Sequence, residues 1–262
     1  MPTEDFIIEL FCQVDDQMFH ATKHSQAMLF PSEVVTLALL FALKGRGNRA
    51  FYRWLKNNWR HFFPSLPHRT RLFRLFNTHR HWTDCFMADP SLIGVIDSYG
   101  IELIHPRREG RSSKQIGKKG LSNQRWIVGG KLCLLLNHLG LVVGWDVDTA
   151  NVYDGSAFQH LVEAVAEDML VFADPHFAKS DWNPPNLKIC AKGTWNDRMM
   201  IETVLSMLTV VCHFKQVGHR VWDYFKSRVG YTMALFNILV QWHGLQPADD
   251  GFVRLSIAEF SL

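Results

Sequence analysis

With 262 residues, 47% of them hydrophobic and 13% aromatic, the chain can bury a sizeable core, which excludes a largely disordered protein. No apolar run approaches the roughly 18 residues that a membrane-spanning helix requires, and the longest, residues 34–43, predicts a buried helix. The formal net charge of +3 identifies no partner by itself, but the positive residues gather in two segments of the chain.

Residues 1–90 predict a helical region. The first helix follows Thr3, a suitable N-cap, and its apolar residues recur at helical spacing as far as Met18. Three further helices, each bounded by glycine or proline, are predicted over residues 32–44, 48–62 and 67–76. The chain opens without the basic start and apolar stretch of a signal peptide, so we expect a cytoplasmic protein.

The first basic segment lies within these helices. Between Glu33 and Asp84 there is no acidic residue, while ten are Lys or Arg. A solvated surface usually mixes both signs, so this segment suggests a polyanionic partner such as nucleic acid. Short basic helices joined by tight turns are typical of a helix-turn-helix-like DNA-binding unit, and an ordinary helical cap with basic faces is the alternative. We expect DNA contacts from Arg69, Arg71 and Arg74.

From about residue 91 the pattern becomes α/β. Strands are predicted over residues 94–97, 130–137, 141–147, 169–174 and 187–191, and helices over 154–167 and 196–213. The second and third strands should form a hairpin. Alternating strands and helices of this kind predict a sheet flanked by helices. We therefore expect a basic helical region over 1–90, a second domain over 91–245 and a C-terminal tail over 246–262.

The second basic segment interrupts the predicted sheet. Residues 107–131 contain eight Lys or Arg and a single acid, Glu109. The same argument about polyanions applies, because so many phosphate-binding side chains are concentrated in one loop. The residues expected to contact DNA here are Arg107, Arg108, Lys114, Lys118 and Lys119.

Two predicted strands end in a lone aspartate, Asp97 and Asp174. Open α/β sheets bind ligands at the carboxyl ends of their strands, although an aspartate there is also common as a turn former or helix cap. A third acid, Glu202, lies on the predicted helix 196–213. Because Arg198 precedes it by one turn, a surface ion pair is the alternative to a functional role. The three acids are informative only as a set.

The cysteines and histidines do not indicate a metal site. The five cysteines are odd in number, scattered and never spaced as a metal-binding pair, so we interpret them as small core residues. Most of the thirteen histidines are expected to be exposed or hydrogen-bonded. His176, two residues after Asp174, either contacts the site of that aspartate or is an ordinary surface histidine.

The order and surroundings of the three acids resemble the DDE transposases of bacterial insertion sequences. Four blocks carry the resemblance: residues 95–98, in which Asp is followed by Ser, residues 147–154 after the third strand, residues 170–177, and residues 198–208 with the order Arg-x-x-Ile-Glu. The resemblance implies a ribonuclease H-like catalytic domain over residues 91–245, with a mixed sheet flanked by helices and an all-helical region before it.

The resemblance also implies a reaction, cleavage of DNA and strand transfer at the terminal inverted repeats of an insertion sequence. Asp97, Asp174 and Glu202 would be the catalytic residues and would hold two Mg²⁺ ions, for which Mn²⁺ can substitute. Two such ions stabilise the attacking and leaving oxygens of a phosphoryl transfer. Arg198 would contact DNA. The implied partners are double-stranded DNA of the repeats and of the target, and further copies of the chain, in a bacterial cytoplasm at the nucleoid.

The sequence departs from the family pattern at three places. Pro175-His176-Phe177 stands where Lys-Gly-Tyr is common, Trp195 takes the place of a tyrosine and Thr209 that of a lysine. All three positions are expected near the cut DNA end. Two alternatives stay open: a catalytically inactive or repurposed transposase-derived protein that binds DNA, and a nuclease with the ribonuclease H fold.

Overall fold

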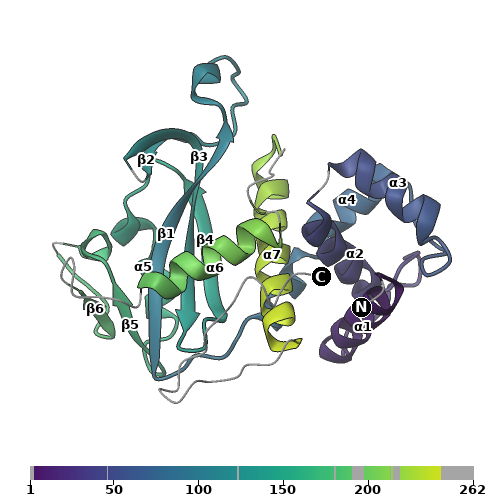
Figure 1. The fold of residues 1–262 in the computed structure, drawn as a ribbon, viewed down its shortest axis with the longest axis horizontal. Helices are drawn as coiled ribbons and strands as arrows, with labels where there is room; N and C mark the ends of the chain where they lie inside the picture. The colour runs from purple at the N-terminus through teal and green to yellow at the C-terminus, as the bar shows by residue number, and fades with distance from the viewer. Residues whose placement is uncertain are drawn as a thin grey trace.

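The computed structural model describes residues 3–242 except 46, 123, 180, 191–197, 213 and 215–218, and it leaves out the side chains of 198–200. In this part of the chain a curled mixed sheet is flanked by helices (Figure 1). The expected α/β class is thereby confirmed. No helix within the described ranges is both long and apolar enough to cross a membrane.

The N-terminal region is helical, as predicted. Its elements are α1 (Thr3–Gln17), α2 (Pro31–Lys44), α3 (Asn48–Asn58), α4 (Arg69–Thr78) and the 3-10 helix η1 (Arg80–Phe86). α2 ends at Gly45, whose φ of 59° is the left-handed conformation that glycine adopts at little cost. α3 ends one turn earlier than predicted. Pro64 disfavours the helical conformation at Phe63, and Phe63 is buried outside the helix.

The sheet consists of β1 (Ile93–Ile104), β2 (Lys118–Ser122), β3 (Arg125–Asn137), β4 (Val142–Thr149), β5 (Leu170–Ala173) and β6 (Leu187–Ile189). β3 pairs antiparallel with β1 on one side, and with β2 and then β4 on the other. On the far side of β1 the pairing becomes parallel, first with β5 and then, through β5, with β6. β1 is therefore central, between an antiparallel and a parallel half.

β1 is much longer than the predicted strand. The strand was expected to end at Asp97, whereas β1 continues through Ser98 to Ile104. The long antiparallel partner β3 pairs with this second half, from Ser98 opposite Cys133 onwards, and satisfies its backbone N–H and C=O groups. Asp97 therefore lies inside a strand.

The two faces of the sheet are covered by different helices. Alternate side chains of a strand point to opposite faces, so Val95 and Ile96 belong to different parts of the core. Val95 packs with residues of α6 (Arg198–Val210) and α7 (Trp222–Trp242), whereas Ile96 packs with α5 (Asp154–Glu163). Figure 1 shows α6 crossing the strands.

α7, which was not predicted, joins the sheet to the N-terminal helices. It lies between them (Figure 1), packing against α2, α4 and η1 on one side and β4 on the other. The buried side chain of Asn237 donates to the carbonyls of Phe86 at 2.9 Å and Val142 at 2.7 Å, and accepts the Val142 N–H at 2.9 Å. One apolar cluster thus runs from α1 to the sheet. The division at residue 90 stays a prediction, and residues 246–262 lie outside the described part.

Candidate active site

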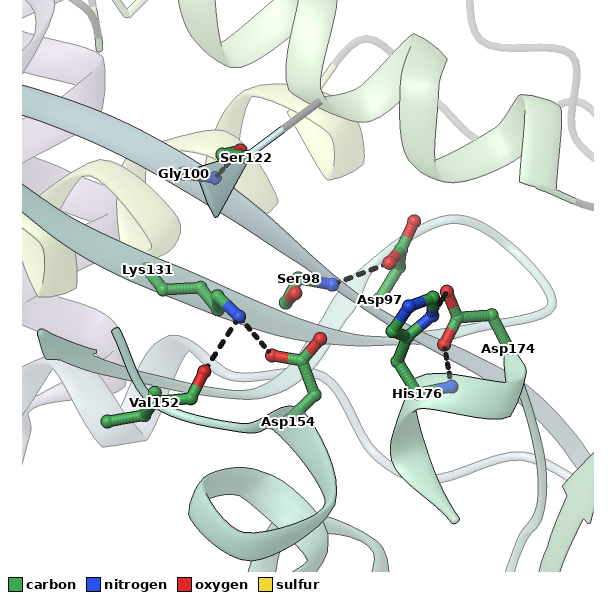
Figure 2. A network of polar contacts seen from close by, with 9 residues as sticks. All are labelled: Asp97, Ser98, Gly100, Ser122, Lys131, Val152, Asp154, Asp174 and His176. Atoms are coloured by element: carbon green, nitrogen blue, oxygen red, sulfur yellow. Dashed lines mark hydrogen bonds and ion pairs between the residues drawn. The ribbon is translucent and has the colours of Figure 1, made fainter. Parts of the chain in front are cut away.

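Asp97 and Asp174 are brought together by the register of two parallel strands. β1 and β5 pair Gly94 with Val171 and Val95 with Phe172. Asp97 follows two residues later inside β1, and Asp174 follows two residues later, directly after the end of β5, so the direction of the two strands brings these aspartates to the same end of the pair. Neighbouring strands lie about 4.8 Å apart, and side chains opposite each other in a parallel pair point to the same face. Figure 2 shows the two side chains near one another. The structure therefore pairs two acids that the sequence placed on separate elements.

The face that these aspartates share is the one covered by α6. Asp97 follows Val95 by two residues, and its partner on β3 is Leu134. Both Val95 and Leu134 pack in the cluster that contains Ile201 of α6. Asp97 and Asp174 are each only partly buried. Their carboxylates are therefore accessible to a ligand from solvent.

Gly94 permits close packing of β1 against Met169, which precedes β5, and against the main chain of β3. A Cβ atom at this position would lie 2.2 Å from Sδ of Met169 and 2.8 Å from the carbonyl oxygen of Leu136. Both distances are far below van der Waals contact, so a larger residue would push the strands apart. The N–H of Leu170 donates to the carbonyl of Leu92 at 2.9 Å and so joins the start of β5 to the start of β1.

Hydrogen bonds orient the carboxylate of Asp174. Its Oδ1 accepts the His176 N–H at 2.9 Å, which makes Asp174 the N-cap of η3 (Pro175–Phe177). Its Oδ2 lies 3.3 Å from Nδ1 of the same histidine. Oδ1 of Asp97 accepts the N–H of Ser98 at 2.7 Å. His176 therefore contacts Asp174 while its side chain is 73% exposed, so it combines both interpretations given for it. Asp174 also caps a short helix, so the structural and functional interpretations of this residue are compatible.

Glu202 is not gathered with the two aspartates. Ile201, Val204 and Leu208 form the buried face of α6, and Glu202 lies on its exposed side. In the described part of the chain, no three His, Cys, Asp or Glu side chains come together so that they could hold a metal ion. The aspartate pair alone offers carboxylate oxygens on one face, which are the hard donors that Mg²⁺ and Mn²⁺ prefer. The side chain of Arg198, and all of Trp195, lie outside the described residues.

A buried ion pair between Lys131 of β3 and Asp154 of α5 lies near the aspartates (Figure 2). Nζ of Lys131 lies 2.9 Å from Oδ1 of Asp154, with 13% and 11% of the two side chains exposed, and also donates to the carbonyl of Val152 at 2.9 Å. Asp154 is the first residue of α5, where a negative charge also complements the helix dipole. The pair therefore ties the start of α5 to β3.

α5 in turn holds the segment that follows Asp174. The side chain of Gln159 donates to the carbonyl of Phe177 at 2.7 Å, and the hydroxyl of Tyr153 donates to that of Ala178 at 2.8 Å. A Cβ atom at Gly155 would lie 2.8 Å from the Phe177 carbonyl oxygen, so the contact is close. These contacts connect Asp174 to the ion pair through η3 and α5. The sequence offered no signal for them, because they join residues that are distant along the chain.

Cys133 lies in the centre of this arrangement and stays a thiol. It is completely buried. Burial raises its pKa well above the ordinary value, and the negative charges of Asp154, Asp97 and Asp146 raise that pKa further. A thiolate nucleophile is therefore disfavoured here. Cys133 is the small core residue that the sequence predicted.

The predicted DNA-contacting residues lie on several elements. Arg69, Arg71 and Arg74 belong to α4, the latter two exposed, and Arg69 faces a cavity. The residues predicted from the second segment are all exposed: Arg107 and Arg108 on η2 (Pro106–Arg108), Lys114 in the following loop, and Lys118 and Lys119 on β2. Lys119 is partly neutralised by Glu109 at 3.0 Å. The other residues of this group form no ion pair within the described part of the chain.

Comparisons with other proteins give no family for the chain: no protein-family model matches it, and no curated protein matches it. Its function can therefore be inferred only from its own residues and geometry. Two partly exposed carboxylates on neighbouring strands can bind a divalent cation, and the uncompensated basic residues can bind phosphates.

Proposed function

We propose that the chain is a DNA transposase of the DDE type, which cuts DNA and joins it at the terminal inverted repeats of an insertion sequence. The observation that carries this proposal is that Asp97 of β1 and Asp174, directly after the neighbouring parallel strand β5, lie near one another (Figure 2). A turn former or a helix cap has no need of a second acid at its side. Two carboxylates that share a face are expected where a divalent cation is bound.

The topology supports a ribonuclease H-like core. The resemblance implies a mixed sheet flanked by helices, with acids on separate elements. The observed sheet has an antiparallel half, β1, β3 and β4, and a parallel half, β5 and β6, with α5 and α6 on opposite faces. The aspartates occupy the junction of the two halves, the position at which sheets of this class bind ligands.

Asp97 and Asp174 would hold the metal. Glu202 of α6 is the third carboxylate that the resemblance implies, and it lies apart from the two aspartates in this structure. Bound Mg²⁺ or Mn²⁺ supplies stabilisation of the attacking and leaving oxygens of the phosphodiester. The role of His176 is to orient Asp174 through the main-chain and ring contacts described above. α6 packs against β1 and so carries Glu202 on the same face of the sheet as the aspartates.

DNA is the proposed partner because the uncompensated positive charge is on exposed side chains of both basic segments. Duplex DNA carries one negative charge about every 1.7 Å along its axis, so a spread of basic residues suits it better than a small anion. We also propose that copies of the chain associate on paired DNA ends and act at the nucleoid of a bacterial cytoplasm.

The test is a strand-transfer assay with labelled duplexes that contain the DNA flanking the reading frame, in Mg²⁺. Asp97→Asn, Asp174→Asn and Glu202→Gln should each reduce cleavage and joining at least about 1,000-fold, because metal-held phosphoryl transfer depends on each carboxylate. Binding of DNA should change less than about twofold, since the contacts to phosphates remain. Asp168→Asn, which changes an exposed acid just before β5, is the matched control and should keep full activity.

Each possible result decides between named functions. Cutting by Asp97→Asn at the wild-type rate contradicts the assignment of this site. Cleavage by the wild type without joining replaces the transposase with a nuclease. Binding of DNA with neither reaction leaves a DNA-binding protein without catalysis.

A further inference from the structure

A cavity of about 850 Å³ lies between the first turns of α3 and α4 and the start of α7. Four arginines line it: Arg49 of α3, Arg69 of α4, Arg220 just before α7, and Arg228 within α7. We term these four residues and their cavity the arginine pocket. Its remaining described lining is apolar or uncharged, and none of it is acidic. The volume is in the range of ordinary ligand sites.

Three of these arginines carry uncompensated charge. Within the described part of the chain, the side chains of Arg49, Arg69 and Arg220 form neither an ion pair nor a hydrogen bond. Like charges around one cavity repel each other, and a bound anion reduces that repulsion. The charge of the arginine pocket therefore favours the binding of an anion.

Arg228 adds an independent observation, a buried guanidinium without a carboxylate partner. It is 5% exposed, and its two terminal nitrogens donate to the carbonyls of Phe41 and Ala42 at the end of α2. Its guanidinium also lies 4.7 Å from the centre of the Phe41 ring. Burial lowers its pKa only to about 10, so it stays positive at neutral pH. Buried charges are ordinarily paired with an opposite charge, and here only dipoles and a ring compensate it.

The first turns of both helices reinforce the positive wall. α3 starts after Gly47, which has no side chain to cap it, and its first main-chain bond runs from the N–H of Phe51. α4 starts after His68, which does not cap it either, and its first such bond runs from the N–H of Arg71. The earlier N–H groups of the two helices have no intrahelical acceptor, and residues that carry them line the cavity.

Arg220 connects the pocket with the second basic segment. It also lines a smaller cavity of about 380 Å³, together with Lys114 and Lys118 of that segment and one acid, Asp148, so three positive side chains face a single negative one there. The first segment contributes Arg49 and Arg69 to the arginine pocket. Basic residues of the two segments therefore line two cavities that share Arg220. A ligand that contacts both sets of residues passes Arg220.

We propose that the arginine pocket binds backbone phosphates of double-stranded DNA, and that the same DNA strand continues over Arg220 to Lys114 and Lys118. The inference rests on the proposed function in taking DNA as the partner. The charges of one strand recur about every 3.4 Å along the axis of a duplex. Because Arg220 lines both cavities, they adjoin each other and one duplex can contact both. A free phosphate or mononucleotide has the same anionic chemistry but cannot span them.

The experiment measures the affinity of the full chain for a fluorescent duplex by anisotropy, without any requirement for cleavage. Arg49→Gln and Arg220→Gln should each weaken binding at least about tenfold, and the slope of log affinity against log salt should fall by about one for each lost phosphate contact. The matched control is Arg60→Gln, an exposed arginine beyond the far end of α3 and outside the pocket, which should change affinity less than twofold. Thermal unfolding verifies that all variants are folded.

Deoxyadenosine monophosphate and inorganic phosphate serve as competitors that separate the ligand sources. We expect neither to displace the duplex at phosphate concentrations equal to that of the DNA. Displacement by either at those concentrations overturns the proposal, as do pocket variants that bind like Arg60→Gln. DNA binding that depends on Arg49 and Arg220 in a protein that never cleaves DNA supports the pocket and removes the transposase proposal. Cleavage with unchanged binding by the pocket variants does the reverse.

Discussion

The aspartate pair and the arginine pocket are opposite in charge and are built in different ways. Asp97 and Asp174 are placed by strand register, so their separation follows from backbone hydrogen bonds. Arg49, Arg69 and Arg220 come from two helix starts and a connecting segment, and their long side chains have no hydrogen-bond or ion-pair partner among the described residues. A pair of carboxylates on adjoining elements suits a small ion, whereas a row of unpaired positive side chains suits a long polyanion.

The largest effect on stability should come from the loss of the buried Lys131–Asp154 ion pair. Lys131→Met leaves Asp154 buried without its partner, and we expect a loss of about 3 kcal/mol in the free energy of unfolding. Urea denaturation measures it. The matched control is Lys119→Met, which removes an ion pair whose side chains are 45% and 38% exposed, and should cost less than about 1 kcal/mol. Equal losses in both variants would show that the acidic region does not depend on buried charge compensation.

A second change tests whether register holds the acidic site. Gly94→Ala forces a Cβ atom against Met169 and the Leu136 carbonyl, so we expect a destabilisation of about 2 kcal/mol in chemical denaturation. Gly144→Ala on β4 is the matched control, because its Cβ atom would lie 3.6 Å from Leu161, an ordinary contact. DNA affinity should stay at the wild-type value in both variants. A Gly94→Ala variant with an unchanged free energy of unfolding would contradict this close packing of β1 against Met169 and β3.

The smallest effect concerns the basic side of the comparison and its pH dependence. Burial lowers the pKa of His219, which lines the arginine pocket, from 6.5 to about 4, and the charge of Arg228 adds to this. Below pH 6.5 the unfolded chain therefore takes up a proton that the folded chain refuses, and stability is lost as pH falls towards 4. Between pH 7 and pH 5 the full shift would cost about 2 kcal/mol, and because His219 is only partly buried we expect solvent screening to reduce this to about 1 kcal/mol.

His219→Phe removes the titrating group and should make unfolding less sensitive to acid over that range. The comparison uses melting temperatures of the wild type and the variant at pH 7 and pH 5, so that all other titrating groups cancel. Saturating duplex DNA should reduce the acid loss of the wild type, because phosphates favour the protonated ring. An identical pH dependence in the two proteins would show that His219 is not a neutral, buried part of the pocket wall.

The elements that the sequence predicted are those with a local signal. Asp97 and Asp174 each follow an apolar run, and the conformation of Gly45 ends α2 where a glycine was expected to end it. α7 carried no such signal, because it is buried almost all round and so lacks the alternation of apolar and polar faces that marks a surface helix. β2, with Lys118 and Lys119 next to a glycine, has little strand propensity of its own and forms by pairing with β3.

The candidate sites divide in the same way. The order of the two aspartates could be predicted, but their contact depends on a parallel register that no local pattern specifies. The role of Arg220 could not be predicted at all, since it depends on a connection before α7 that packs against the starts of α3 and α4. Glu202 was predicted with the aspartates, and the structure places it on the adjoining helix without gathering it into their group.

The three hydrogen bonds of Asn237 have a mechanical consequence. They fasten α7 to both η1 and β4, and the main body of the core continues through the same contact. The N-terminal helices and the sheet are therefore connected through α7. If DNA binds at α3 and α4, the distance from that binding surface to the aspartates is set by this connection. That distance would then determine which phosphodiester of the bound duplex lies next to the aspartates.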